Sequence, residues 1–286
     1  MSRVNNTIAL LGLALTLGIS TAHAQEQARE TLLSPADAPY AFSLHAEIGF
    51  LAPLAHSIQF GKEGTNFDYI AEGGQDNLFP FMRISAETEL WDHHNVVLLY
   101  QPLQLVSSVK LRRDLVADDV TFPEGTPMDL TYGFDFWRLS YLYDFFEAPE
   151  TELAIGASLQ IRNATIAFES QDGMLGRYTR DIGPVPIIKV RGRTDLGPRF
   201  WVGGEFDGFW APIRYINGSS SDVEGAIADL SVRGGVHLLQ GVDAFLGLRY
   251  LGGGARGTSN SEPNPGDDYV NNWLHFGSVT LGFTVR

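Results

Sequence analysis

Two histidines and a serine are the side chains of this sequence whose types could support hydrolysis. His56 is followed directly by Ser57, and His275 lies near the end of the chain, after the acidic pair Asp267 and Asp268. A histidine can act as general base for a serine hydroxyl when the two lie within hydrogen-bonding distance. If the first and last strands of the fold are neighbours, these residues meet at one rim. They then predict a lipid or peptide hydrolase, and the alternative is two histidines in a hydrated interface.

Strand parity predicts where the two imidazoles point. Counting in twos from Val279 places His275 on the outward, apolar face of the last strand, and counting from Phe42 places His56 outward on the first. A bulge at Pro53 would reverse the second count. We expect both histidines to face outward within about 10 Å of each other, with a hydroxyl or carboxylate in reach, because a shared site requires this geometry.

A second set of charged residues recurs at alternate positions of the predicted strands. Seven are acidic and seven are basic, so the set is close to neutral. Inside a narrow closed barrel, buried charges must be paired. We expect a salt-bridge network that plugs the lumen, and the alternative is a narrow conduit for a small solute. The members are Glu47, Arg83, Glu87, Glu89, Asp135, Arg162, Lys189, Arg191, Arg193, Glu205, Asp207, Asp229, Arg233 and Arg249.

One turn supplies a register for part of this network. Folding the chain back at Gly197-Pro198 places Arg191 opposite Glu205 and Lys189 opposite Asp207. Opposite charges directly across an antiparallel pair stabilise it. The sequence indicates no cofactor. The acidic pairs Asp118-Asp119 and Asp267-Asp268 are candidates for a metal, of which Asp267 and Asp268 are retained, but their spacing matches no EF-hand calcium loop, so solvated charge is the alternative.

The elements that must position these residues are strands. Apolar and polar residues alternate with a period of two through most of the chain, which is typical of strands with one apolar face. Ten such segments are long enough to cross a bilayer when tilted. They lie at 40–50, 82–90, 96–110, 130–144, 153–168, 187–194, 200–211, 225–238, 244–251 and 273–285.

The connections between these segments alternate between short and long. Long polar connections are expected at 55–80, 112–128, 169–186, 212–224 and 252–272. An all-β, closed, antiparallel up-and-down transmembrane barrel has this plan, with short periplasmic turns and long extracellular loops. Trp91, Trp137 and Trp210 lie near strand ends, where aromatic girdles meet the headgroups. A soluble periplasmic β-protein is the alternative, because alternation does not say whether the apolar face meets lipid or a core.

The first residues read as an export signal. Arg3 precedes the apolar run from Ile8 to Ile19, and Ala22-His23-Ala24 is a cleavage site. We therefore divide the chain into a signal peptide (1–24), a periplasmic lead-in (25–39) and a barrel (40–286). The net charge of −14 leaves no basic surface for nucleic acid, and the absence of cysteine excludes disulfides and thiolate metal sites.

These features make the mature chain resemble the small bacterial outer-membrane β-barrels over nearly its whole length. The resemblance implies residence in the cell outer membrane, with outer-membrane lipid as a partner. The omptin proteases share the ten-stranded architecture and use an Asp pair and an Asp-His pair at the outer rim. Here the adjacent Asp92-His93 falls at the opposite end, and the chain finishes on Arg286 where such barrels typically finish on an aromatic residue.

We therefore expect a non-enzymatic barrel with a structural role or a role in binding an extracellular ligand or partner through its loops. The first alternative is the rim-sited hydrolase, and the second is the solute conduit. Fold alone does not deliver function.

The sequence predicts location and topology directly. After cleavage behind Ala24, we expect the protein to fractionate with the outer membrane and to show heat-modifiable gel mobility. A tag in the Asp267 loop should be reachable from outside intact cells, and a tag at Asn95 should not. Recovery in the soluble periplasmic fraction would contradict the membrane fold.

Overall fold

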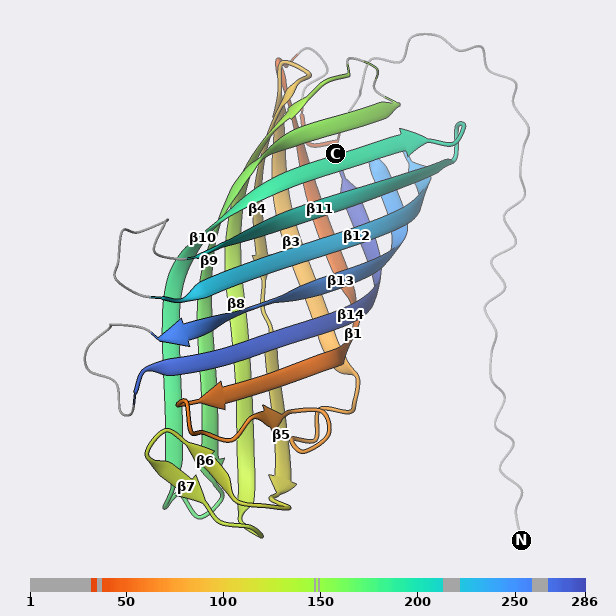
Figure 1. The fold of residues 1–286 in the computed structure, drawn as a ribbon. Helices are drawn as coiled ribbons and strands as arrows, with labels where there is room; N and C mark the ends of the chain where they lie inside the picture. The colour runs from red at the N-terminus through yellow and green to blue at the C-terminus, as the bar shows by residue number, and fades with distance from the viewer. Residues whose placement is uncertain (1–31, 35–37, 147, 149, 213–221, 259–266) are drawn as a thin grey trace, which may run out of the picture.

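The chain forms antiparallel strands over most of its described length. The computed structural model describes residues 32–34, 38–146, 148, 150–212, 222–258 and 267–286. Figure 1 shows the strands as arrows, and the predicted signal peptide and most of the lead-in lie outside the described residues. The long strands are β1 (Tyr40–Phe60), β3 (Phe79–Leu90), β4 (His94–Gln101), β8 (Pro127–Asp144), β9 (Thr151–Ser170), β10 (Gly176–Asp195), β11 (Phe200–Pro212), β12 (Glu224–Leu239), β13 (Val242–Thr258) and β14 (Tyr269–Val285).

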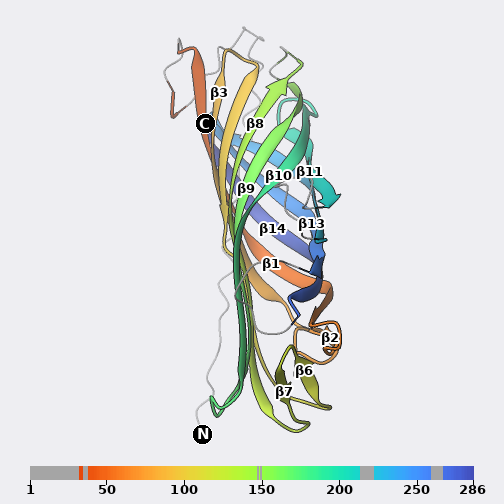
Figure 2. The same cartoon turned by 60° about the vertical axis from the view of Figure 1, so that its left-hand side comes forward.

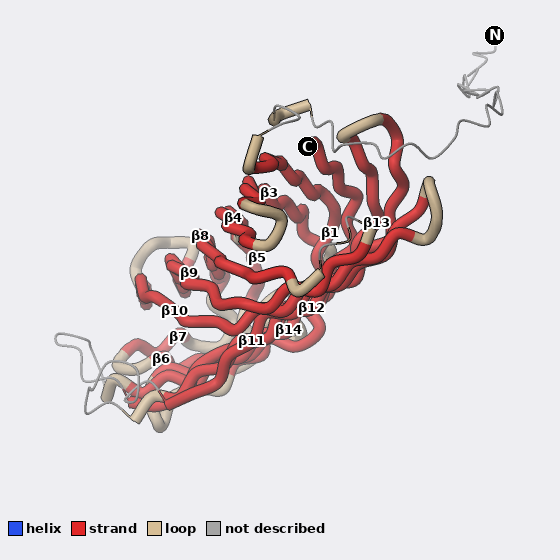
Figure 3. The backbone as a smooth tube through the Cα atoms, turned by 90° about the horizontal axis from the view of Figure 1, so that it is seen from above, coloured by secondary structure: helices blue, strands red, loops and turns tan. Residues whose placement is uncertain are grey.

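The sheet closes on itself. Its strands follow the order β14-β13-β12-β11-β10-β9-β8-β4-β3-β1, and β14 pairs with β1 from Val285 opposite Leu44 to Val270 opposite Phe60. Strand β5 (Gln104–Lys110) continues β4 along the same edge of β8. Seen from above, β3, β4, β8 and β9 face β11 to β14 across the interior (Figure 3). The prediction of an all-β, closed, up-and-down barrel of ten strands is confirmed.

The barrel has two unlike ends. At one, here the turn end, brief connections such as Trp91–His93 and Leu196–Arg199 join the strands, and the C-terminus lies there. At the other, here the loop end, β2 (Phe67–Asp68) and the hairpin of β6 (Leu115–Ala117) and β7 (Val120–Phe122) lie together (Figures 1 and 2). The first short turn is Trp91–His93, so Asn95 lies within β4. The tag that the sequence analysis placed at Asn95 should therefore be placed at Asp92, within the turn.

The wall is apolar outside and charged inside. On β1, Ile48 is 59% exposed and Phe50 is 60% exposed, whereas Glu47, directly before Ile48, is 6% exposed. The same contrast separates Met82 from the buried Arg83 on β3. A soluble protein buries its large apolar side chains, and this arrangement is typical of outer-membrane barrels. In the described part of the chain, no helix is long and apolar enough to cross a membrane.

One expected long loop is a strand. The segment 169–186 was predicted as a connection, but Gly176–Asp195 is continuous β10, and only residues 171–175 join it to β9. Pro184 and Pro186 favour a loop because proline cannot donate a ladder hydrogen bond. The register explains why they are tolerated: β10 pairs with β11 only from Ile188 onward, so both prolines lie where one edge of β10 has no strand partner.

The interior of the loop end is an apolar core that the alternation did not predict. Phe67 and Tyr69 come from the connection between β1 and β3, and Phe122 comes from the hairpin β6–β7. All three pack among buried side chains of the wall, including Leu105 and Phe168. We call this cluster the loop-end core. Its other members include Leu51, Ile58, Phe60, Phe81, Leu103, Leu111, Leu115, Met128, Leu130, Tyr132, Ile166, Leu251, Leu274 and Phe276.

Phe168 tests how far the loop-end core stabilises the fold. Its ring is 1% exposed and lies 5.4 to 5.8 Å from the rings of Phe60, Phe67 and Tyr69. We expect Phe168→Ala to lower the free energy of unfolding by about 3–5 kcal/mol, measured by denaturant titration in lipid vesicles. Leu78→Ala is the control, because Leu78 is exposed in a connection. Equal small losses in both variants would contradict a packed core.

Candidate functional site

The barrel interior has three zones, and β1 passes through all of them. From Leu51 onward, its inward side chains join the loop-end core. Glu47 belongs to a network of ion pairs in the middle, here the charge network. His45 lines a cavity at the turn end, here the turn-end cavity. These zones are where the polar residues singled out from the sequence meet.

The charge network is a chain of short ion pairs across the middle of the interior. Lys189 Nζ lies 2.5 Å from Glu205 Oε1 and 3.0 Å from Asp207 Oδ2. Arg138 bridges Asp207 and Asp229 at 2.9 and 3.1 Å. Buried charges of this kind cost free energy unless each has a counter-charge and hydrogen bonds, which this chain of contacts supplies.

Further ion pairs extend the charge network to β1, β3, β12 and β13. Arg83 Nη2 lies 3.0 Å from Glu205 Oε1, and Arg233 Nη2 lies 3.0 Å from Glu47 Oε1. Arg249 closes on Asp229 at 2.5 Å. The network therefore joins β1, β3, β8, β10, β11, β12 and β13 through side chains as well as through the sheet.

Two residues depart from the predicted set. Arg138 was missed although it is 1% exposed and central; it lies two residues after the buried Phe136 on β8 and shares its inward parity, which was the available signal. Asp135 was expected in the lumen, but it has the opposite parity to Arg138. Its Oδ1 accepts the N–H of Leu103 at 2.8 Å, where the chain breaks between β4 and β5. Arg162 on β9 and Glu89 on β3 were also expected in the lumen. Each stands at the same alternate positions as the buried residues of its strand.

The register about Gly197-Pro198 is as predicted, but the ion pair inferred for Arg191 is wrong. Arg191 lies opposite Glu205 in the sheet. Its guanidinium reaches instead across the interior to Glu87, at 2.6 and 2.8 Å, and to Glu152 at 2.6 Å. The physical reason is competition, because Glu205 already contacts Lys189 and other cations, whereas Glu87 and Glu152 have Arg191 within reach.

The prediction that His56 faces outward is wrong because β1 has a bulge. The register shifts between Pro53 and Ala55, which reverses the parity of every later residue of β1. His56 is therefore inside, 2% exposed. Its Nδ1 lies 2.7 Å from Gln75 Oε1, and its ring stacks on Tyr69 with centroids 4.2 Å apart.

His275 keeps its predicted outward parity, so the two histidines point to opposite faces of the same wall. Its Nδ1 lies 2.6 Å from the hydroxyl of Tyr250. Among the described residues no hydrogen bond joins Ser57 to His56 or His275. The geometry does not assemble the predicted Ser/His/acid set.

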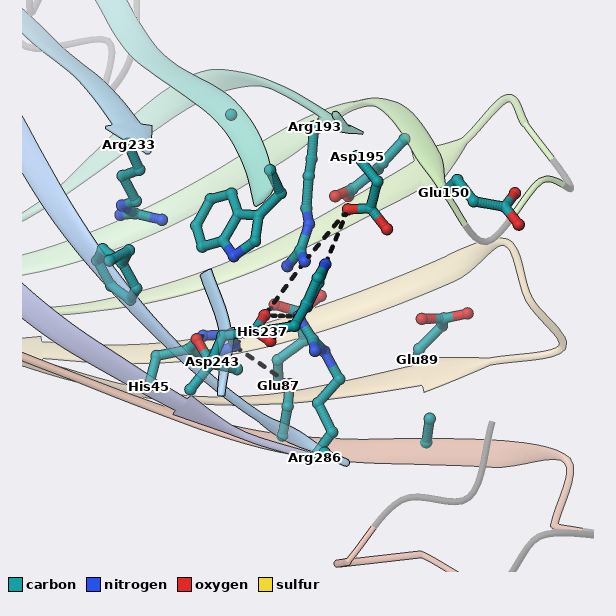
Figure 4. Close-up of a pocket in the computed structure, with 18 of the residues that line it drawn as sticks. His45, Glu87, Glu89, Glu150, Arg193, Asp195, Arg233, His237, Asp243 and Arg286 are labelled. Carbon is teal, nitrogen blue, oxygen red and sulfur yellow. Dashed lines mark hydrogen bonds and ion pairs between the residues drawn. The ribbon is translucent and has the colours of Figure 1, made fainter. Parts of the chain in front are cut away.

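The turn-end cavity has a volume of about 630 Å³ and is lined by many charged and polar side chains. Figure 4 shows His237 at its centre, held between Asp243 and Asp195. His237 Nδ1 lies 2.8 Å from Asp243, and its Nε2 lies 3.5 Å from Asp195. Arg286 and Arg193 contact the same Asp243 at 2.8 and 3.1 Å. The carboxylate of Asp243 is thus neutralised by its neighbours.

A second histidine of this cavity comes close to a hydroxyl. Ser43 Oγ lies 3.1 Å from His45 Nε2, which is a distance suited to base and nucleophile. However, the nearest carboxylate, Glu87, lies on the same nitrogen at 3.6 Å, and Nδ1 meets the hydroxyl of Thr284 at 2.9 Å. A carboxylate that orients the imidazole belongs on the other nitrogen. The arrangement is therefore a polar network with no assembled nucleophile.

At the loop end, charged side chains fasten the connections. Arg113 holds Glu72 with contacts of 2.7 and 2.8 Å, and this hydrogen-bonded guanidinium lowers the pKa of the Glu72 carboxyl below its ordinary value. The candidate metal residue Asp267 accepts the N–H of Lys62 at 3.0 Å. In the described ranges, no group of three or more His, Asp or Glu side chains, with or without Asp268, could hold a metal ion.

Comparison with known proteins bears on the fold. No protein-family model matches the sequence, and no curated protein matches it. Among solved structures, the chain is similar to the outer membrane protease OmpT from Escherichia coli, with a TM-score of 0.50 and 8% identity over 85% of this chain and 96% of that one. It also matches Neisserial surface protein A, with a TM-score of 0.32 and 12% identity over 86% and 98% of the two chains. At these identities the likeness concerns the fold, which is that of the small outer-membrane β-barrels.

A double-mutant cycle tests the partner of Arg191. We expect Arg191→Ala to cost about 3–5 kcal/mol of unfolding free energy, because it leaves Glu87 and Glu152 without their counter-charge. Combining it with Glu87→Ala should recover about 0.5–3 kcal/mol relative to the sum of the single changes. The matched cycle with Glu205→Ala should be close to additive. A larger coupling to Glu205 than to Glu87 would contradict the geometry.

Proposed function

We propose that this protein is a closed outer-membrane barrel that conducts no solute and carries a fastened set of surface loops for a structural or ligand-binding role. The supporting observation is the loop-end core, in which side chains from two connections fill the space between the strands. In this proposal the loop end faces outside and the turn end faces the periplasm, as is general for outer-membrane barrels. The cell outer membrane is the proposed location, and its lipid surrounds the wall.

The fastening of the connections supports a role for their surface. Arg177 on β10 holds Asp118 of the hairpin at 2.7 Å, and both side chains are buried. Arg113 ties the hairpin segment to the connection that carries Glu72. Because such cross-links hold the connections in one arrangement, a ligand or partner that binds them meets a pre-ordered surface, which lowers the entropy cost of binding.

The alternatives have less support. The rim hydrolase needed His56 and His275 on one face, and they occupy opposite faces. A conduit needs a continuous polar path, but Tyr69 and Phe122 are fully buried in the loop-end core, and Arg138 and Asp207 are equally buried in the charge network. Ten strands leave little space beyond such side chains.

Planar-bilayer recording tests this proposal. We expect the full-length refolded barrel to insert without producing stepwise ion currents, because the loop-end core and the charge network leave no open path. A variant in which a short Gly-Ser linker replaces residues 112–125, and with them the hairpin β6–β7, should conduct more readily than the intact protein. Stable, stepwise currents from the intact protein would contradict the proposal and favour the conduit.

A further inference from the structure

His56 of β1 joins the barrel wall to the connection between β1 and β3, which fills part of the loop end. Its Nδ1 lies 2.7 Å from Oε1 of Gln75, and its ring stacks on that of Tyr69 with centroids 4.2 Å apart. The N–H of Tyr69 donates to the carbonyl of His56 at 2.9 Å. Both partners belong to the connection, so the imidazole fastens this segment in the interior. The proposed function gives the histidine no further role.

The contacts of His56 require a neutral imidazole. An amide oxygen only accepts hydrogen bonds, so Nδ1 carries the proton and Nε2 keeps its lone pair. Nε2 is buried and has no hydrogen-bond partner among the described residues, and the residue as a whole is 2% exposed. A second proton, on Nε2, would place a charge where neither water nor an acceptor reaches it. Such a charge costs free energy.

The groups around the imidazole supply little compensation for a positive charge. The connection contributes Tyr69 and β8 contributes Tyr132, whose phenols stay neutral below about pH 10. Strand β14 contributes the apolar ring of Phe276. The charged side chains are Asp68 of β2 and, near Tyr132, Arg162 of β9, which has the same sign as an imidazolium. Asp68 is exposed and already accepts two backbone N–H groups of its own turn.

The connection is the part that can give way when His56 takes up a proton. Strand β1 is held in the wall, because His56 lies opposite Leu274 within the long ladder between β1 and β14. The connection is held less firmly by backbone pairing, since only Ser57 and Ile58 of β1 pair with β2. Withdrawal of the connection lets water reach the imidazole and leaves the wall intact.

We propose that His56 is a pH-sensitive latch that holds the connection between β1 and β3 at neutral pH and releases it in mild acid. The inference rests on the proposed function, because it concerns the same loop surface. The released connection carries Glu72 away from Arg113, which takes apart the pre-ordered arrangement. A ligand or partner bound to that surface therefore dissociates as the pH falls, in the way that histidine protonation switches other interfaces.

Proton linkage gives the direction and the size of the effect. A released, hydrated imidazole titrates at its ordinary pKa of about 6.5, whereas the closed state has no place for the second proton. Above this pH both states are neutral, so the closed state keeps its full advantage. Below it only the released state gains a proton, and the ratio of released to closed molecules rises about tenfold from about pH 7.5 to about pH 5.5. Carboxylates titrate near pH 4, below this window.

Amide hydrogen exchange of the full-length refolded barrel tests the latch. The N–H groups of Tyr69 and Gln75 are bonded within the closed connection, and both residues are fully buried. Their protection, corrected for the intrinsic effect of pH on exchange, measures how often the connection opens. We expect this protection to fall about tenfold between about pH 7.5 and about pH 5.5. The N–H of Phe134, bonded to the carbonyl of Leu103 in the wall, should keep its protection.

Three variants identify the group that senses the acid. His56→Gln cannot take up a proton, so its connection should be equally protected at both pH values. His275→Gln is the matched control on the neighbouring strand β14, because His275 is bonded to the hydroxyl of Tyr250 on the outer face, and it should keep the tenfold loss. If His56→Gln lacks heat-modifiable mobility, His56→Phe places a neutral ring among the same aromatic side chains, with the same expected result.

The outcomes separate the possibilities. Loss of protection in the intact protein and in His275→Gln, but not in the His56 variants, supports the latch. An equal loss in the His56 variants would overturn it, because another group would then sense the acid. Unchanged protection in the intact protein would also overturn it and would leave the closed barrel standing. Failure of the proposed function looks different, because the connection would then be unprotected, and the barrel would conduct, already at about pH 7.5.

Discussion

Closure of the hydrogen-bonded sheet is the constraint on which the rest of this structure depends. A hydrocarbon environment offers no partner for backbone N–H and C=O groups, so a sheet that faces it cannot keep an open edge. The pairing of β14 with β1, continuous apart from one bulge, removes that edge. Closure also fixes two faces with opposite requirements, which is why Ile48 points out of the wall and Glu47 points into it.

The interior must then be filled, and it is filled in two ways. In the middle, strand side chains of opposite charge compensate one another, with Arg138 between Asp207 and Asp229. At the loop end, the connections return to the interior and contribute Phe67, Tyr69 and Phe122 to an apolar core. Within the described residues, the turn end keeps a cavity of about 630 Å³, lined mostly by residues of the strands themselves. The cavity therefore lies at the turn end because the side chains of the long connections fill the interior at the loop end.

Strand number, closure and the face of most charged residues could be predicted from the sequence, because a period of two directly encodes them. The misses have local physical causes. A single bulge after Pro53 reversed the parity of His56. The prolines of β10 predicted a loop, but they lie at a strand edge that is not paired with β11 and therefore tolerates them. The loop-end core could not be predicted because Phe67 and Tyr69 lie in a segment without periodicity. The reach of Arg191 to Glu87 depends on side chains from distant strands, which no register about one turn reveals.

The central claim is that packed side chains close the loop end, and the absence of cysteine from the natural sequence makes it directly measurable. Leu130 is fully buried in the loop-end core, whereas Leu78 is exposed in the connection before β3. Single cysteines at these two positions can be treated with a membrane-impermeant thiol reagent in the folded, membrane-inserted protein. The account predicts rapid labelling of Leu78→Cys and protection of Leu130→Cys until the protein is unfolded. Equal rates of labelling at both positions in the folded protein would contradict it.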